Sequence, residues 1–169
     1  MRVIIPTDLS IDSEKAICNL VPLLKDRDVK ATLFHCVEPP MSGGSIMINV
    51  SDVLVENAAN KLDKIKKALL NLSEGTIEVA HHVSFGQFQR QLDNFVSSSD
   101  PDLVIMPSDR KSFIERILIG QRSLSFIGEL SAPTLITPFN KKQPVEVSIG
   151  LAIDQREGMD EKVKKQINH

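Results

Sequence analysis

Large aromatic side chains are scarce in this sequence, which has seven phenylalanines and neither tryptophan nor tyrosine. The core must therefore be mainly aliphatic, and a protein that stacks nucleobases on exposed aromatic rings is disfavoured. Basic residues are not in excess either, because 20 of them stand against 22 acidic residues and give a formal charge of −2. A general nucleic-acid-binding protein would show a strong basic excess, so we expect no nucleic-acid partner.

Cysteine is equally rare, with Cys18 and Cys36 as the only two. No C-x-x-C spacing exists, so neither a metal site nor a redox motif is indicated. Both residues are expected to be small buried hydrophobes in a reducing compartment. The chain has no run of 18 apolar residues, and no basic segment followed by an apolar region opens it. We therefore expect a cytoplasmic protein without a membrane partner.

Three glycine-containing motifs are also missing. The pattern G-x-x-x-x-G-K-S/T is absent, which excludes a P-loop for phosphates, and G-x-G-x-x-G is absent, which excludes the dinucleotide-binding fingerprint. The pattern G-x-S-x-G of nucleophile-elbow hydrolases is absent too. The sequence predicts no catalytic residue and no metal ligand. The pair His81-His82 does not change this, because adjacent strand residues point to opposite faces of a sheet.

Strand and helix patterns alternate along the chain, whose 169 residues suit one domain. A first helical pattern falls within residues 12–24, with Pro22 as its expected kink. Gly75 is expected to end the longest helix. Apolar, β-branched runs predict strands at 2–6, 30–37, 76–84, 103–107 and 133–138, and helical spacing predicts further helices at 50–72, 85–96 and 123–130. This α/β pattern predicts a five-stranded parallel sheet with helices on both faces, in three α/β/α layers.

Ligands of such sheets bind outside the carboxyl ends of the strands, where the winding direction reverses. We therefore expect the working surface at the ends of the first and fourth strands. Asp8 follows the first strand and Asp109 the fourth, which would suit a magnesium ion held together with a nucleotide's phosphates. The alternative for Asp8 is a turn residue that bonds its own backbone. His35, in the second strand, is expected to be a core or half-buried histidine.

The last part of the chain falls outside this unit. Residues 139–169 are predicted to form a linker and a strand–helix extension, after a domain that spans residues 1–138. The stretch 149–154, followed by Glu161-Lys162, resembles the opening stretch 3–8, followed by Glu14-Lys15. Two interpretations stay open: a second repeat cut off after its first strand and helix, or a chance similarity.

Four stretches carry a family resemblance, namely Pro6-Thr7-Asp8, His35-Cys36-Val37-Glu38-Pro39, Asp102-Leu103-Val104-Ile105-Met106 and Ser131-Ala132-Pro133-Thr134-Leu135-Ile136-Thr137-Pro138. With them, residues 1–138 resemble the universal stress protein family. The resemblance implies a fold like that of adenine nucleotide alpha hydrolases, an adenine nucleotide such as ATP as ligand, and a homodimer joined through the last strand. It also implies that Asp8 faces the nucleoside, that Val37 contacts the adenine, and that Met106 lines the pocket floor.

The phosphate-binding stretch departs from the family pattern. The nucleotide-binding branch has G-x-x-G, nine residues, then G-S or G-T, whereas this chain has Pro107-Ser108-Asp109-Arg110, nine residues, then Gly120-Gln121. Proline lacks an N–H, and Arg110 and Gln121 replace small phosphate-binding residues, so a triphosphate cradle of the family type is disfavoured. Nearby basic side chains either bind an anion directly or form a solvated basic surface; they are Arg110, Lys111, Arg116 and Arg122.

Three functions follow as hypotheses. The first is a stress-response module that binds an adenine nucleotide or related small molecule, with Mg²⁺ only alongside the nucleotide, and acts through dimerisation. The second is a nucleotide-free interaction protein of the same fold. The third is a weak ATPase, for which no general base can be named. The predicted binding residues are Pro6, Thr7, Asp8, Val37, Met106, Asp109, Arg110, Gly120, Gln121, Arg122 and Ser123.

Overall fold

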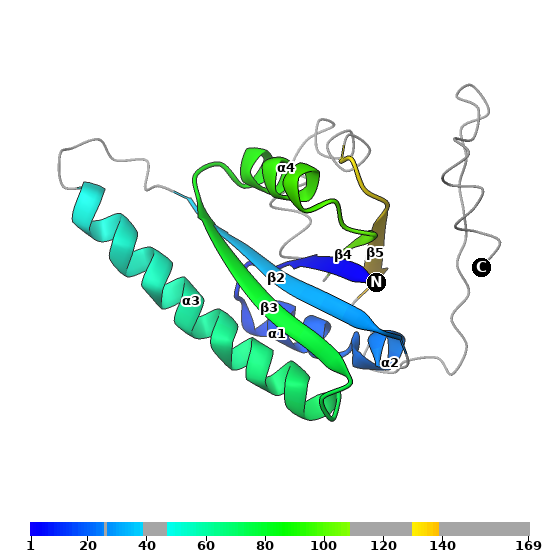
Figure 1. The fold of residues 1–169 in the computed structure, drawn as a ribbon. Coiled ribbons are helices and arrows are strands. Elements are labelled where there is room, and N and C mark those ends of the chain that lie inside the picture. The colour runs from blue at the N-terminus through cyan, green and yellow to red at the C-terminus, as the bar shows by residue number, and fades with distance from the viewer. Residues whose placement is uncertain (26, 39–46, 109–129, 139–169) are drawn as a thin grey trace, which may run out of the picture.

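Five parallel strands form a single sheet in a computed structural model that describes residues 1–25, 27–38, 47–108 and 130–138. The order across the sheet is β3-β2-β1-β4-β5 (Figure 1). The strands are β1 (Arg2–Pro6), β2 (Val29–Val37), β3 (Ile77–Phe85), β4 (Leu103–Ser108) and β5 (Thr134–Pro138). The predicted five-stranded parallel sheet is confirmed. The predicted helix at 123–130, apart from Leu130, and the extension at 139–169 lie outside the described residues.

Helices cover both faces of the sheet (Figure 1). On one face lie α1 (Ile11–Cys18), α2 (Val21–Leu24) and α3 (Met47–Leu72), and on the other lies α4 (Phe88–Ser99). The two cores follow from alternation along β2, because Leu33 packs with the α1–α3 side whereas Phe34 packs with α4. The buried strand residues thus build two cores, one on each face of the sheet.

Three helices differ from their predicted bounds, and one of them is α3, which begins at Met47 and not at residue 50. The first helical pattern is broken after Cys18, and Pro22 lies in the first turn of α2, where its missing N–H breaks no hydrogen bond. The helix expected at 85–96 spans Phe88–Ser99, because β3 continues to Phe85 and Gly86 turns the chain with a φ of +135°. A side chain at Gly86 would be strained in this conformation and would approach Gln91 within 3.1 Å.

The winding direction of the chain reverses between β1 and β4. These strands are neighbours, with Val3 opposite Leu103 and Ile4 opposite Val104. From β1 the chain winds outward to β2 and β3, and then crosses back to β4 and β5 on the other side. The predicted neighbourhood of the first and fourth strands is therefore confirmed, and the carboxyl ends of the central strands are where this fold places ligands.

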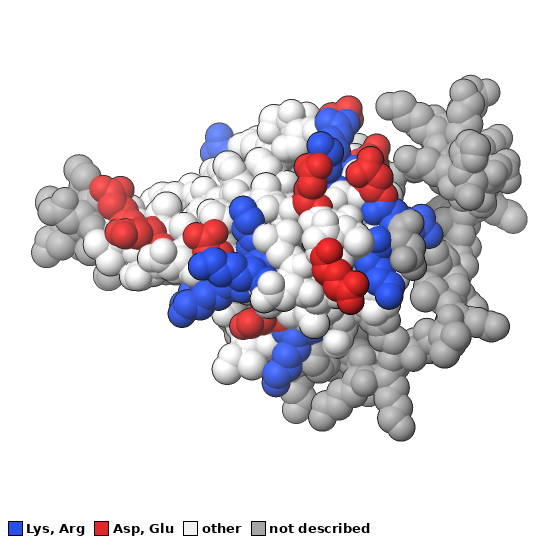
Figure 2. Space-filling model, turned by 60° about the horizontal axis from the view of Figure 1, so that its bottom comes forward, with Lys and Arg blue, Asp and Glu red and all other residues white. Residues whose placement is uncertain are grey.

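Charges are mixed on the side of the molecule that carries α1, α2 and α3. In Figure 2 blue and red side chains alternate across white surface, with no broad field of one sign among the described residues of this face. One ion pair here joins Lys15 to Asp12 on α1 at 3.9 Å, and both side chains are more than half exposed. This mixture agrees with the near-neutral composition of the chain.

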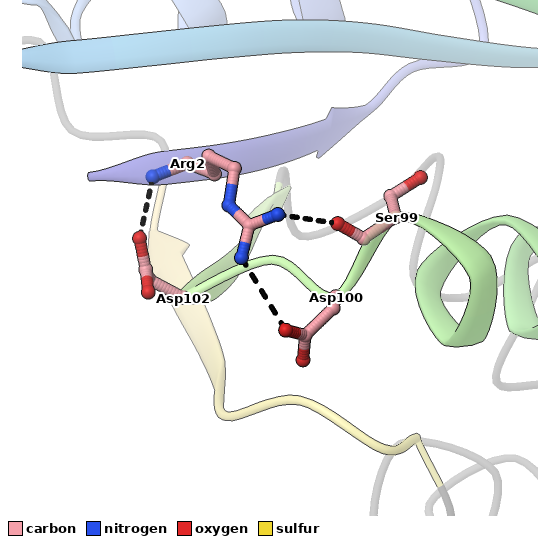
Figure 3. A network of polar contacts seen from close by, with 4 residues as sticks. All are labelled: Arg2, Ser99, Asp100 and Asp102. Carbon is pink, nitrogen blue, oxygen red and sulfur yellow. Dashed lines mark hydrogen bonds and ion pairs between the residues drawn. The ribbon is translucent and has the colours of Figure 1, made fainter.

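A polar network fastens the amino end of β1 to the turn between α4 and β4 (Figure 3). The Arg2 N–H donates to Asp102 Oδ2 at 2.6 Å, and the Asp102 N–H donates to the Arg2 carbonyl at 2.9 Å. The Arg2 guanidinium also donates to the Ser99 carbonyl at 3.0 Å and reaches Asp100 at 3.3 Å. The network fixes the start of two neighbouring strands at the end opposite the expected site.

Replacing Asp102 with alanine should lower the free energy of unfolding by about 1 kcal/mol, because the Arg2 N–H loses its partner. The matched control is Asp100→Asn, which removes a charge at a side chain that is 92% exposed but keeps a residue that tolerates the left-handed φ of 46°. Urea denaturation should show no change for this control. Equal losses in the two variants would contradict the role given to Asp102.

Candidate functional site

The turn from β1 into α1 is held by three side-chain contacts. The hydroxyl of Thr7, which is buried, shares a hydrogen bond with Ser13 Oγ at 2.8 Å and accepts from the Leu9 N–H at 3.0 Å. Ser10 caps α1, since its hydroxyl accepts from the Ser13 N–H at 3.1 Å. Leu9 itself has a φ of 59°, an uncommon value for leucine that these bonds maintain. The backbone beside Asp8 is therefore fixed in place.

The two oxygens of Asp8 have different surroundings. Oδ1 accepts from the Ser10 N–H at 3.0 Å, which is the turn-forming role expected of an aspartate here. Oδ2 is buried and has no hydrogen-bond partner among the described residues. A buried, unpaired carboxylate oxygen costs free energy, and a donor brought by a ligand would remove that cost. One carboxylate oxygen thus makes the turn, and the other has no hydrogen-bond partner among the described residues.

The end of β2 extends beyond the end of β1. Pairing between these strands stops at Pro6 and Phe34, whereas pairing of β2 with β3 continues to Val37 and Phe85. The Val37 carbonyl accepts from the Gly86 N–H at 2.9 Å, on the β3 side. Because main-chain groups of successive strand residues point to alternate sides, those of Cys36 face the space past β1. They have no backbone partner among the described residues.

A pocket of about 560 Å³ opens at this place, beside the end of β2 and not, as predicted, beside that of β4, since no β4 residue is among its described lining residues. Its walls come from the β1–α1 turn, the end of β2, one face of α3 and the first residues of α4. Ionisable side chains from three of these elements line it: Asp8, His35, Glu38 and Lys61. The apolar wall includes Val37, Leu54, Ala58 and Phe88. The volume and the mixed lining suit a small organic ligand.

His35 lies in the pocket with a defined ring orientation. Its Nδ1 is 2.8 Å from the Thr7 carbonyl, which can only accept, so Nδ1 carries the proton. Burial lowers the pKa of His35 below its usual value, and Lys61 lowers it further, although the Thr7 carbonyl and Asp8 act in the opposite direction. The ring is therefore neutral at pH 7 and bears its lone pair on Nε2.

Cys36 is held as a thiol. Its Sγ–H donates to the Gly86 carbonyl at 3.2 Å, and burial, followed by the charge of Glu38, raises the pKa of the thiol to about 11. Because the thiolate is the nucleophile, a group with this pKa is unreactive near neutrality. The pocket therefore uses Cys36 for packing and offers no activated nucleophile there.

The structure brings together some of the predicted binding residues. Thr7, Asp8 and Val37 line the pocket, whereas Pro6 and Met106 are buried and are not among its lining residues. Met106 packs fully buried in the core beneath α4, so its contact with a ligand stays a prediction. The other predicted residues lie outside the described part of the chain: Asp109, Arg110, Gly120, Gln121, Arg122 and Ser123. In that described part, no group of three or more potential metal ligands exists.

His35 is half-buried, as predicted, but sequence reasoning missed its place in the pocket and the contribution of α3 and α4. The signal for His35 was present, because it stands two residues before Val37 on the same face of β2 and past the end of β1. Lys61 and Gln87 line the pocket only because α3 and α4 pass over the strand ends. No local pattern marks either of them.

Acidification should destabilise this fold through two histidines. His82 stacks on Phe95 with ring centroids 4.3 Å apart, and burial, followed by the charge of His81, lowers its pKa, as burial does for His35. The unfolded chain then binds protons near pH 6.5 that the folded chain does not. Stability is full above pH 6.5 and declines below it, until the pH has passed the lowered pKa values of the two histidines.

Urea denaturation at pH 7.5, 6.5 and 5.5 measures this loss. His82→Phe keeps a ring against Phe95 and removes one titrating group, so its stability should fall less steeply than that of the wild type. The range stops at pH 5.5 because carboxylates begin to titrate below it. An unchanged slope in the variant would contradict the assignment to His82.

Comparison with known proteins places these observations in a family. Residues 1–138 match the model of the universal stress protein family. A universal stress protein of Methanocaldococcus jannaschii is 26% identical over 147 residues, which cover 84% of this chain and 84% of that protein. Within the residues that the structure describes, no helix is both long and apolar enough to cross a membrane.

Solved structures share the fold. The universal stress protein UspA from Lactobacillus plantarum has a TM-score of 0.63 at 13% identity, with 82% of this chain and 96% of that chain covered. The universal stress protein from Archaeoglobus fulgidus in complex with dAMP has a TM-score of 0.55 at 13% identity, with coverages of 80% and 96%. At these identities the likeness concerns the arrangement of the chain.

Proposed function

Because the chain belongs to the universal stress protein family, we propose that it binds an adenine nucleotide or nucleoside in the pocket where β1 and β2 end. The observation that carries the proposal is the unpaired, buried Oδ2 of Asp8. Ribose hydroxyls and exocyclic amines are hydrogen-bond donors, and they would pair this oxygen. The dAMP held by a relative of the same fold is a ligand of that chemistry.

The described pocket favours the nucleoside part of such a ligand over its phosphates. The charged lining residues include two carboxylates, of Asp8 and Glu38, and one ammonium group, of Lys61. The apolar wall around Val37 offers a surface for a purine ring. The sequence lacks three of the four residues of the family's phosphate loop, so phosphates should add little affinity.

Isothermal titration calorimetry tests the proposal with adenosine, AMP, ADP, ATP and cyclic AMP at pH 7.5. We expect adenosine to bind, and each added phosphate to change the affinity less than tenfold. Guanosine serves as the control for the base. No heat and no thermal shift at millimolar concentrations of any adenine ligand would contradict the proposal. That outcome would favour a nucleotide-free interaction protein of the same fold.

We also infer that the protein acts in a stress response as a cytoplasmic homodimer joined through β5. In the described residues β5 pairs on one side only, with β4, and Ile136 on this strand is 41% exposed. An unpaired edge with an exposed apolar side chain invites pairing with a second copy. The two cysteines, both free, support a reducing compartment.

Light scattering after size exclusion measures the oligomeric state. Ile136→Lys, which places a charge on the edge strand, should convert the dimer into a monomer. Ile11→Lys is the matched control, since Ile11 is 72% exposed on α1, away from the edge. A monomeric wild-type protein would refute the dimer without touching the ligand proposal.

A further inference from the structure

The ring of His35 occupies a position that links three walls of the pocket. β2 carries the residue, the Thr7 carbonyl of the β1–α1 turn fixes Nδ1 at 2.8 Å, and α3 faces the ring with Lys61. The bond to Thr7 spans 28 residues of sequence and joins β2 to the residue directly before Asp8. The ring therefore cannot rotate without loss of this contact.

The second ring nitrogen, Nε2, has different surroundings from Nδ1. Nε2 makes no hydrogen bond among the described residues. Two buried side-chain atoms lack a hydrogen-bond partner among the described residues: Asp8 Oδ2, and His81 Nδ1, which lies outside the pocket and 3.2 Å from Asp63 Oδ1. His35 is half-buried and lines the pocket. In the neutral ring with Nδ1 protonated, Nε2 is a pure acceptor.

We propose that His35 is a specificity-determining residue whose Nε2 accepts a hydrogen bond from a donor of the bound ligand, an amine or a sugar hydroxyl. This inference rests on the proposed function and adds a second acceptor to the carboxylate of Asp8. With both acceptors in place, the pocket selects ligands with two donor groups within reach of each other, as on a nucleoside. A ligand whose edge carries acceptors or an anion is rejected.

Protonation of His35 reverses this selection. The imidazolium has two N–H donors and no acceptor, so a donor of the ligand would face the Nε2–H donor and could form no hydrogen bond with it. The charged groups that face the ring are Asp8 after β1 and Lys61 on α3, with Glu38 and the Cys36 thiol at the end of its own strand. Binding of an uncharged nucleoside should therefore weaken as the pH falls below the pKa of His35.

The experiment measures the affinity for adenosine from pH 8 to pH 5. Adenosine is chosen because a phosphate would be attracted to the imidazolium and would mask the effect. The wild-type affinity should be constant near neutrality and fall by up to tenfold per pH unit in the acid range. His35→Phe should bind about 3- to 10-fold more weakly at pH 7.5, the value of one hydrogen bond, with no dependence on pH.

Two further variants separate this role from a structural one. In His35→Gln the amide oxygen replaces the Nε2 acceptor, so the affinity at pH 7.5 should stay within about threefold of the wild type and be independent of pH. His82→Phe removes a histidine whose pKa is also lowered but whose ring packs on Phe95 outside the pocket, so its binding curve should follow the wild type. Equal losses in His35→Gln and His35→Phe would overturn the inference.

Ligand analogues identify the donor that meets Nε2. Purine riboside lacks the exocyclic amine, and the 2′-, 3′- and 5′-deoxyadenosines each lack one hydroxyl. The analogue that lacks the relevant donor should bind the wild type 3- to 10-fold more weakly than adenosine does, and His35→Phe with the same affinity as adenosine. If no analogue behaves in this way, the inference is wrong while nucleoside binding stands.

The ligand-free protein gives a separate readout. Nitrogen-15 spectra of the histidine rings should show His35 with its proton on Nδ1 at pH 7.5. A proton on Nε2 would overturn the inference whatever the pocket binds. Failure of the wild type to bind any adenine ligand at pH 7.5 would overturn the proposed function and this inference together.

Discussion

Phe34→Ala is expected to lower the free energy of unfolding by about 3–5 kcal/mol, the largest effect among the substitutions considered. The side chain is fully buried in the middle of β2. Its ring centroid lies 5.3 Å from that of Phe95, 6.1 Å from that of Phe88 and 5.9 Å from that of His82. Alanine would leave a cavity where β2, β3 and α4 meet, and the rings around it would lose their contacts.

Phe85→Ala is the matched control. Phe85 has the same side chain at the end of the neighbouring strand, but it is 42% exposed, so its loss should stay below about 1 kcal/mol. Urea denaturation compares the two variants, and the ratio of their losses is the informative quantity. Similar losses would mean that the core beneath α4 is not the packed unit that the ring distances describe.

The consequence of Phe34→Ala reaches the pocket. Phe88 packs edge-on against Phe34, opens α4 and lines the pocket. A cavity below this residue would loosen the first turn of α4, so ligand affinity should fall along with stability. Phe85→Ala leaves that contact intact and should bind as the wild type does. The aromatic cluster thus couples the stability of the sheet to the shape of the site.

The strands and the order in which they alternate with helices were predictable because each strand is a short apolar, β-branched run. Both faces of the sheet are covered, and the buried residues of its central strands include Ile4 and Ile5 in β1 and Val104 and Ile105 in β4. Such strands are continuous apolar runs, without the alternation of apolar and polar residues that a half-exposed strand shows. The helix boundary at Phe88 was not predictable, because nothing local shows that Gly86 adopts a φ of +135°. A glycine is equally compatible with a strand end or a helix start.

The candidate site was predictable where a strand end carries it and not where helix packing decides it. Asp8 follows β1 and Val37 ends β2, so their neighbourhood follows from a parallel sheet with these strands side by side. Lys61 lies 14 residues into α3, and its approach to the pocket depends on the angle at which that helix crosses the sheet. The two roles of Asp8 were set out from sequence as alternatives, whereas the structure gives one oxygen to the turn and leaves the other unpaired.

Asp8→Asn is expected to separate these two roles, with ligand affinity reduced by roughly 10- to 150-fold and stability unchanged or slightly raised. The amide oxygen of asparagine can accept the Ser10 N–H as Oδ1 does now, so the turn keeps its hydrogen bond. The NH₂ group takes the place of Oδ2, the oxygen that is buried and has no partner among the described residues. A ligand donor would then meet a donor, and the loss of a charge-assisted hydrogen bond is worth about 1.5–3 kcal/mol.

Calorimetry with adenosine and urea denaturation of the same protein sample test both halves of this expectation. Asp12→Asn is the control, because it makes the same chemical change at an exposed position in the first turn of α1. If Asp8→Asn unfolds more easily than the wild type but binds adenosine with the same affinity, the carboxylate serves the turn alone. If both stability and affinity fall, its charge is needed for the fold. Only a loss of affinity at unchanged stability assigns Oδ2 to the ligand. In that case the turn forms without the carboxylate charge, whereas ligand binding requires it.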